Sequence, residues 1–180
     1  MAPPNDYSAA HIVVRSFEET IRLLPHMFFG RQRSDPALAG AVLSTVLRDT
    51  LGPDREAAPD LVVELIIESD HRFTLTDNLV NDMDKLDANG WPLRRWTIGA
   101  LVAVSAHAAI EIRTADRQWL REFTGPTLTD SRDHEPIGTP GTRITCDLDR
   151  DYFAARAALP RAEDLLDTPD DRVTILDLRP

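Results

Sequence analysis

The sequence predicts an α+β fold, a two-layer sandwich in which helices cover one face of a mostly antiparallel sheet. Segments with helical periodicity and segments with strand composition come in blocks, not in the regular alternation that a parallel sheet requires. The chain of 180 residues is long enough for one domain with a sizeable core. Apolar residues make up 42% of it and charged residues 28%, which is ordinary for a globular protein.

The N-terminal third predicts mainly helices. Ser16 and Glu19 have the spacing of a capping box, so a helix is expected over residues 16–25. An Asp-Pro start and a Gly-Pro stop predict a second helix over residues 35–51. A short apolar run at residues 12–14 is a strand candidate.

The remainder of the chain predicts most of the sheet. The Val/Leu/Ile run at 61–68 and the alternating run at 72–76 are expected to pair as a hairpin. A third helix is expected over residues 93–107, and the Pro/Gly/Asp-rich residues 126–140 are interpreted as a surface excursion. The other expected elements are strands at 109–113, 118–123, 143–148 and 172–178, with a short helix at 152–158.

Composition excludes several classes of function. The net charge of −10 disfavours a nucleic-acid backbone or an anionic membrane as a partner. No apolar run reaches the length of a bilayer span and no signal peptide is recognised, so a cytoplasmic protein is expected. Cys146 is the only cysteine, which leaves no disulfide or cysteine cage within one chain. The histidines lack paired ligand spacing, so no metal site is expected.

One run of residues is specific enough to indicate a protein family. Residues 7–30 read YSAAHIVVRSFEETIRLLPHMFFG. This run resembles the opening of the ATPase domain of the gyrase B and topoisomerase IV family, where Tyr-x-Ala-x-x-Ile-x-Val leads into Leu-Glu-x-Val-Arg-x-x-Pro-x-Met-Tyr-x-Gly. Further segments similar to this family lie at residues 73–77, 98–112, 141–145 and 172–179. The resemblance implies the Bergerat, or GHKL, ATP-binding fold over residues 1–180, with a lid at about 79–97 that is shorter than in gyrase.

The resemblance also implies a ligand pocket. Asp77 stands where the family's aspartate accepts a hydrogen bond from the adenine amino group, and Thr142 where a threonine completes that contact. Arg121 aligns with an arginine at the pocket mouth that contacts aminocoumarin inhibitors in the family. The other positions at which we expect ligand contacts are Val46, Met83 and Gly99. The arginines that we expect near an anionic group of a ligand are Arg48, Arg94 and Arg95.

Two residues that the family uses in catalysis are replaced. The glutamate that polarises the attacking water aligns with Ser44, and the asparagine that holds magnesium aligns with Arg48. A serine is no general base unaided, and an arginine is a permanent cation that repels Mg²⁺. Of the lid glycines that would cradle phosphates, only Gly99 is present. The resemblance therefore implies a pseudo-ATPase and no enzyme.

Three functions stay open at this point. The first is binding of a small molecule in the adenine pocket: ATP or ADP without magnesium, or an aminocoumarin-like compound. The second is an interaction protein that forms a homodimer or pairs with a gyrase-type subunit through the N-terminal arm around Tyr7. The third is a repurposed enzyme, which no nucleophile or acid–base pair in the sequence supports. A carboxylate kept at a pocket floor favours the first, because a scaffold has no need of one there.

Overall fold

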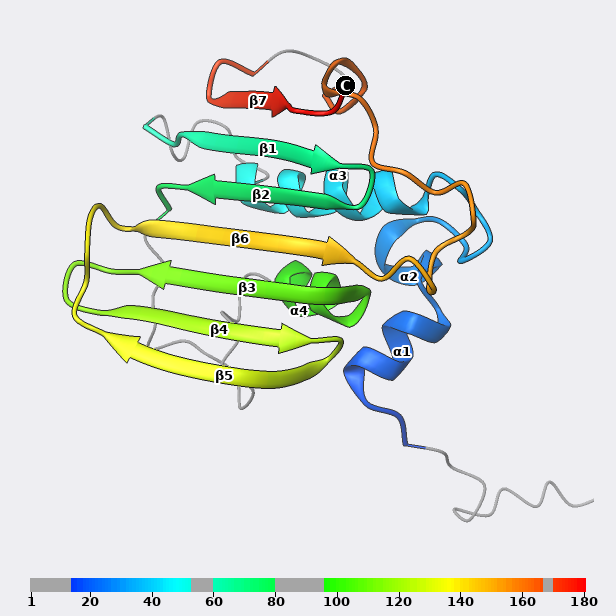
Figure 1. Cartoon of the computed structure of the whole chain (residues 1–180), viewed down its shortest axis with the longest axis horizontal. Helices are drawn as coiled ribbons and strands as arrows, with labels where there is room; N and C mark the ends of the chain where they lie inside the picture. Colours follow the sequence, from blue (N-terminus) through cyan, green and yellow to red (C-terminus); the bar gives the residue numbers. More distant parts are fainter. Residues whose placement is uncertain (1–13, 53–59, 80–95, 167–169) are drawn as a thin grey trace, which may run out of the picture.

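The computed structural model describes residues 14–52, 60–79, 96–166 and 170–180. The fold is α+β, as expected, with seven strands in one open, mostly antiparallel sheet of order β5-β4-β3-β6-β2-β1-β7 (Figure 1). The elements are α1 (Phe17–Leu23), α2 (His26–Phe29), α3 (Leu38–Leu51), β1 (Val63–Ser69), β2 (Arg72–Asp77), α4 (Trp96–Ala103), β3 (Ser105–Arg113), β4 (Gln118–Thr124), β5 (Thr127–His134), β6 (Gly141–Leu148), η3 (Ala162–Asp164) and β7 (Val173–Asp177).

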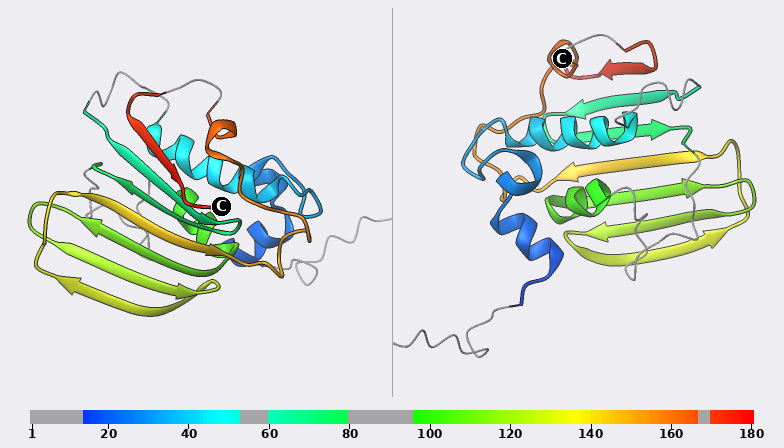
Figure 2. Two further views of the ribbon diagram at one scale, coloured as in Figure 1. Left: turned by 45° about the horizontal axis from the view of Figure 1, so that its top comes forward. Right: turned by 180° about the vertical axis from the view of Figure 1, so that it is seen from behind.

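The helices lie on one face of the sheet, with α3 along β2 and α4 over β3 (Figure 2). Alternate strand residues point toward them. On β2, Phe73 and Leu75 are fully buried, whereas Arg72 on the opposite face is exposed. The two faces therefore differ in chemistry, because period-two alternation sends apolar side chains to the helices and polar ones to solvent.

The predicted helix starts are confirmed in part. Ser16 and Glu19 form the capping box, with each side chain bonded to the other residue's amide. The expected single helix is two, because the chain turns at Pro25 between α1 and the one-turn α2. The second expected helix begins later than predicted, since the carboxylate of Asp35 accepts the amide of Ala37 at 2.9 Å and caps a turn that precedes α3.

The third helix is shorter than predicted. It ends at Ala103, and strand β3 begins at Ser105, so the prediction of helix to residue 107 is wrong. The Ser105 hydroxyl donates to the Leu101 carbonyl at 2.6 Å at this junction. The apolar run continues through helix and strand alike, and such a run does not mark the boundary by its periodicity.

The interpretation of residues 126–140 as a surface excursion is wrong in its first half. Residues Thr127–His134 form β5, which pairs antiparallel with β4 along its whole length. Nearly all of its side chains are exposed, because β5 is the edge strand and lies beyond the helices (Figure 1). A strand exposed on both faces needs no apolar alternation, so its sequence carries no strand pattern.

Two smaller predictions also differ from the structure. Residues 152–158 form turns in place of a short helix, and the 3₁₀ helix lies further on, at Ala162–Asp164. Of the strand candidate at 12–14, the first two residues lie outside the described residues. Val14 is in no strand and is 89% exposed.

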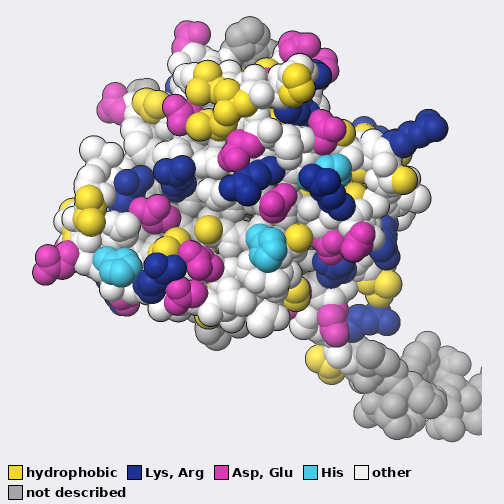
Figure 3. Space-filling model, in the orientation of Figure 1, with side chains coloured by type: hydrophobic (Ala, Val, Ile, Leu, Met, Phe, Trp, Pro, Cys, Tyr) yellow, Lys and Arg dark blue, Asp and Glu magenta, His cyan; other side chains and the backbone are white. Residues whose placement is uncertain are grey.

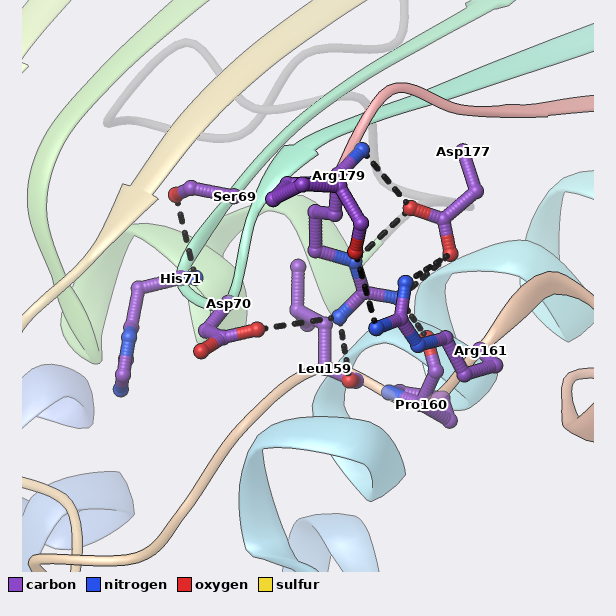
Figure 4. A network of polar contacts seen from close by, with 9 residues as sticks. Ser69, Asp70, His71, Leu159, Pro160, Arg161, Asp177 and Arg179 are labelled. Carbon is purple, nitrogen blue, oxygen red and sulfur yellow. Dashed lines mark hydrogen bonds and ion pairs between the residues drawn. The ribbon is translucent and has the colours of Figure 1, made fainter.

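The last strand, β7, is confirmed and is the one parallel neighbour in this sheet, paired with β1. A network around Arg179 fixes the chain just after it (Figure 4). The Arg179 guanidinium, 6% exposed, bonds Asp177 at 2.7 Å and the carbonyls of Leu159 and Pro160 at 2.8 and 2.7 Å. It also reaches Asp70 of the β1–β2 turn at 3.3 Å. One arginine thus joins three segments that are distant in sequence.

Candidate functional site

Asp77 and Thr142 come together across two neighbouring strands. Asp77 is the last residue of β2 and Thr142 the second of β6, and their Cα atoms are partners in the antiparallel register. Both lie on the face that the helices cover, in the alternation that also buries Leu75 and Ile144. Asp77 is 3% exposed and Thr142 fully buried. A carboxylate and a hydroxyl thus stand side by side in the interior.

The main chain around Asp77 is held by side-chain hydrogen bonds. Its own carboxylate accepts the amide of Leu79 at 3.0 Å. The neighbouring Asn78 accepts the amide of Val62 and donates to the carbonyl of Asp60, both at 2.8 Å. These contacts fix where β2 ends, and the end of β2 sets the position of the carboxylate.

Val46 and Gly99 lie on the two helices above this face. Val46 is fully buried on α3, and Gly99 is buried in α4. The helices are joined by a hydrogen bond from the Thr97 hydroxyl of α4 to the Asp49 carboxylate of α3. Asp49 and Thr97 carry no signal in the sequence, because two residues on separate helices share no motif.

Arg121 lies farther from Asp77 than the other described candidates. It is on β4, and strands β3 and β6 separate it from β2. At ordinary strand spacing this is about 14 Å across the sheet. Its side chain is half-buried on the helix-covered face, with the guanidinium over the Trp119 ring at 4.3 Å from the centroid. A ligand that touches both Asp77 and Arg121 must therefore extend over three inter-strand spacings, from β2 to β4.

The two positions that the resemblance aligns with the family's catalytic glutamate and magnesium-binding asparagine are on α3. Ser44 is half-buried, and Arg48, one turn later, is exposed. The predicted contacts Met83, Arg94 and Arg95, with most of the predicted lid, lie outside the described residues.

The opposite face of the sheet is polar. Basic and acidic side chains are interspersed over its middle, as Figure 3 shows in the orientation of Figure 1. A hollow of about 300 Å³ lies there, with Arg72, His107 and Glu122 in its lining. These charges have partners within the face: Arg72 bonds Glu68 at 2.8 Å, and Arg132 bonds Glu122 at 3.0 Å. Paired and exposed charges of this kind are typical of a solvated surface.

Cys146 is a buried thiol on β6. Burial raises its pKa to about 12, and its sulfur lies 3.1 Å from the Ser105 hydroxyl. A thiol of this kind stays protonated and is a poor nucleophile or metal ligand. Within the described ranges, no group of three or more His, Cys, Asp and Glu side chains has the arrangement of a metal site.

Comparison of the chain with protein-family models and with curated proteins finds no match. In the part of the chain that the structure describes, no helix is both long and apolar enough to cross a lipid bilayer.

Proposed function

We propose that this chain is a non-catalytic, gyrase B-like (GHKL) domain that binds a small molecule at Asp77 and Thr142. The observation that carries the proposal is the pairing of these two residues on the buried face of the sheet. A carboxylate accepts hydrogen bonds only, whereas a hydroxyl both donates and accepts. Together they match a ligand edge that presents an amino group beside an acceptor, as adenine does. The ligand is a nucleotide or an aminocoumarin-like compound.

The surroundings of the pair support a ligand with an apolar body. Leu75 and Ile144 occupy the next positions on the same face, and Val46 is buried on the helix above it. Apolar walls with a few placed polar groups are typical of small-molecule sites. A compact ligand contacts the pair alone, and a longer one also reaches Arg121.

The proposal includes the absence of ATP hydrolysis. Ser44 and Arg48 stand where the family has its base and its magnesium ligand, and neither side chain supplies that chemistry. We expect no Mg²⁺-dependent phosphate release above background. Turnover that persists through purification and is lost in Asp77→Asn would contradict this part of the proposal.

A thermal-shift screen tests the binding. Adenosine, ADP, ATP and novobiocin are added separately, with and without Mg²⁺. A ligand that binds only the folded state stabilises it by about 2.7 kcal/mol at one hundred times its Kd. We expect at least one compound to raise the Tm of the wild type and to have little effect on Asp77→Asn. A panel without any shift rejects the binding function.

A second candidate is the interaction protein, and exposed apolar side chains near the N-terminus favour it. Val14, Leu23 and Met27 are exposed by 89%, 54% and 66%. Phe17 and Phe28 are close to these residues in the sequence, and their rings pack edge to face with the centroids 5.9 Å apart. The segment follows directly on residues that resemble the gyrase dimer arm, so we propose a second copy of this chain as its partner.

Light scattering over a range of protein concentrations tests this candidate. A dimer is expected to become a monomer in Leu23→Glu/Met27→Glu, because burying two carboxylates in an apolar contact is costly. Val62→Glu is the matched control, since Val62 is 59% exposed and lies next to β1. A wild-type protein that stays monomeric at all concentrations rejects the homodimer.

A further inference from the structure

A second hollow lies on the polar face of the sheet, where β2 ends and β6 begins. It has a volume of about 200 Å³, and Glu64, Thr76 and Arg113 are in its lining. Each of the three directly follows a fully buried apolar residue of its strand. Because strand side chains alternate between faces, these three side chains lie on the face opposite the helices.

The guanidinium of Arg113 is largely buried but poorly paired. Its side chain is 21% exposed, and its Nε atom is buried without a hydrogen bond to any residue that the structure describes. Oε1 of Glu111 is 3.7 Å from Nε, which is too long for a hydrogen bond. The same carboxylate accepts from the Gln118 amide at 2.8 Å. A buried cation is costly unless acceptors satisfy it, so an added anion would stabilise Arg113.

Two other arginines of this face show the contrast. Arg72 is 47% exposed and bonds Glu68 at 2.8 Å, and Arg132 is 46% exposed and bonds Glu122 at 3.0 Å. The more buried Arg113 thus has the longer ion pair. Burial strengthens the need for a well-placed carboxylate, because a buried charge loses more of its hydration than an exposed one.

The space beside Arg113 is left by a glycine. Arg113 ends β3, and its cross-strand partner on β6 is Gly141, which has no side chain. Cross-strand partners are close enough for their side chains to touch, so a larger residue at 141 would adjoin the guanidinium. The hollow is smaller than the pockets of about 300–1,000 Å³ that hold drug-sized ligands. Its ligand is therefore a small molecule.

A carboxylate shares the lining with this cation. Glu64 is exposed, and its carboxylate has no ion pair within the described ranges. We propose that the hollow binds a small zwitterion, an amino acid whose carboxylate bonds Arg113 and whose ammonium group lies against Glu64. A guanidinium matches a carboxylate with two parallel hydrogen bonds. Glu64 attracts the ammonium group and repels a ligand that carries negative charge alone.

This site is separate from the proposed adenine pocket. Asp77 also borders the hollow, but its side chain points to the helix-covered face, as does that of Thr142. Binding of a zwitterion at Arg113 therefore does not depend on the proposed function.

An NMR titration of the ¹⁵N-labelled full chain tests the proposal. The probes are glycine, β-alanine and 4-aminobutyrate, which differ in the distance between their charges, and acetate, which has the carboxylate alone. We expect at least one amino acid to shift the amide resonances of Thr76 and Arg113 and to bind about tenfold more tightly than acetate. The proposal is overturned if none of the three amino acids causes these shifts, or if all bind as weakly as acetate.

Two variants separate the two charges. Arg113→Gln should weaken the binding of both the amino acid and acetate about tenfold. Glu64→Gln should weaken only the amino acid, again about tenfold, and leave acetate binding no weaker. Because Glu64 is exposed, this variant decides the question even if Arg113→Gln fails to fold. Unchanged amino-acid affinity in Glu64→Gln overturns the proposal.

Arg72→Gln is the matched control, because it removes a positive charge from the same face at an arginine that already has a bonded carboxylate. It should bind acetate and the amino acid as wild type does. A loss as large as in Arg113→Gln would assign the effect to net charge and overturn the proposal.

Discussion

Gly141 lies directly against the main chain of Asp77: a β-carbon built on Gly141 would stand 2.1 Å from the Asp77 carbonyl oxygen. Its φ of +154° is also one that side-chain-bearing residues rarely adopt. This close approach occurs at the first residue of β6, immediately before Thr142. The pairing of Asp77 with Thr142 therefore depends on a residue that has no side chain.

Gly141→Ala is expected to lower the free energy of unfolding by about 2 kcal/mol or more, because either β2 or β6 must shift. Ligand binding at Asp77 should weaken as well. Gly125→Ala is the control: its φ is +55°, and a β-carbon there has no atom within 4 Å. That change should cost about 1 kcal/mol through the backbone alone. Urea denaturation measures the free energy of unfolding of both variants. Equal losses in Gly141→Ala and Gly125→Ala would show that the close approach to Asp77 is unimportant.

Asp77→Asn is expected to weaken ligand binding by about 2 kcal/mol or more. The amide keeps the shape of the carboxylate and can still accept from Leu79, but it presents a donor to the ligand's own donor. Stability without ligand should hardly change. Calorimetry and thermal unfolding measure the two effects. If the variant unfolds, or binds every ligand as wild type does, Asp77 is a structural residue.

Arg121→Ala is expected to separate ligands by size. A compact ligand such as adenosine should bind unchanged, because Arg121 is about 14 Å from Asp77 across the sheet. A long ligand such as novobiocin should bind about tenfold more weakly through loss of a charged contact. Calorimetry with both ligands checks this. A loss of adenosine affinity would place the ligand elsewhere on the face.

Arg179→Gln is expected to destabilise the fold by about 2 kcal/mol, because two carbonyls and a carboxylate lose their buried donor. Arg161 also faces Asp177, at 3.8 Å, but is half exposed. Arg161→Gln should cost less than about 0.5 kcal/mol. Urea denaturation of both variants makes the comparison, and similar losses would contradict the special role of Arg179.

The same arginine makes stability depend on pH. Its hydrogen bonds to Asp177 hold the pKa of that carboxyl well below the ordinary 3.8. As the pH falls, Asp177 takes up a proton in the unfolded state before it does so in the folded state. Its contribution to the free energy of unfolding is therefore present above pH 3.8 and is lost as the pH falls below that value. Between about pH 4 and pH 2, stability should fall less steeply in Arg179→Gln than in wild type. Parallel curves of stability against pH for the two proteins would contradict the role of Arg179 in lowering the pKa of Asp177.

Cys146 should resist thiol reagents in the folded protein. With its pKa raised to about 12, the thiolate fraction at pH 8 is about a thousandfold below that of an ordinary thiol, and the side chain is 1% exposed. Labelling with iodoacetamide should be negligible in buffer and rapid in denaturant. Equal rates in the two conditions would show that β6 opens readily.

The elements that were predicted well carry local signals. The Ser16–Glu19 capping box, the Val/Leu/Ile run of β1 and the alternation of β2 each express within a few residues the geometry that they adopt. Strand β5 lacks such a signal, since hydrogen bonds to β4 define it and neither face is buried. The boundary between α4 and β3 is hidden for another reason: the buried residues of α4 continue without a break through Val104 to Ser105, the first residue of β3.

By itself, the sequence determined the α+β class and pointed to Asp77 and Thr142 through a resemblance at fixed positions. Only the tertiary structure decided that these residues are cross-strand partners in the interior, that Gly141 must be a glycine, and that Asp49 bonds Thr97. Local patterns report on neighbours a few residues away, and helix and strand periods arise there. Helix packing joins Asp49 to Thr97, 48 positions apart, and strand register joins Asp77 to Thr142, 65 positions apart. No local pattern encodes which residues will meet over such separations.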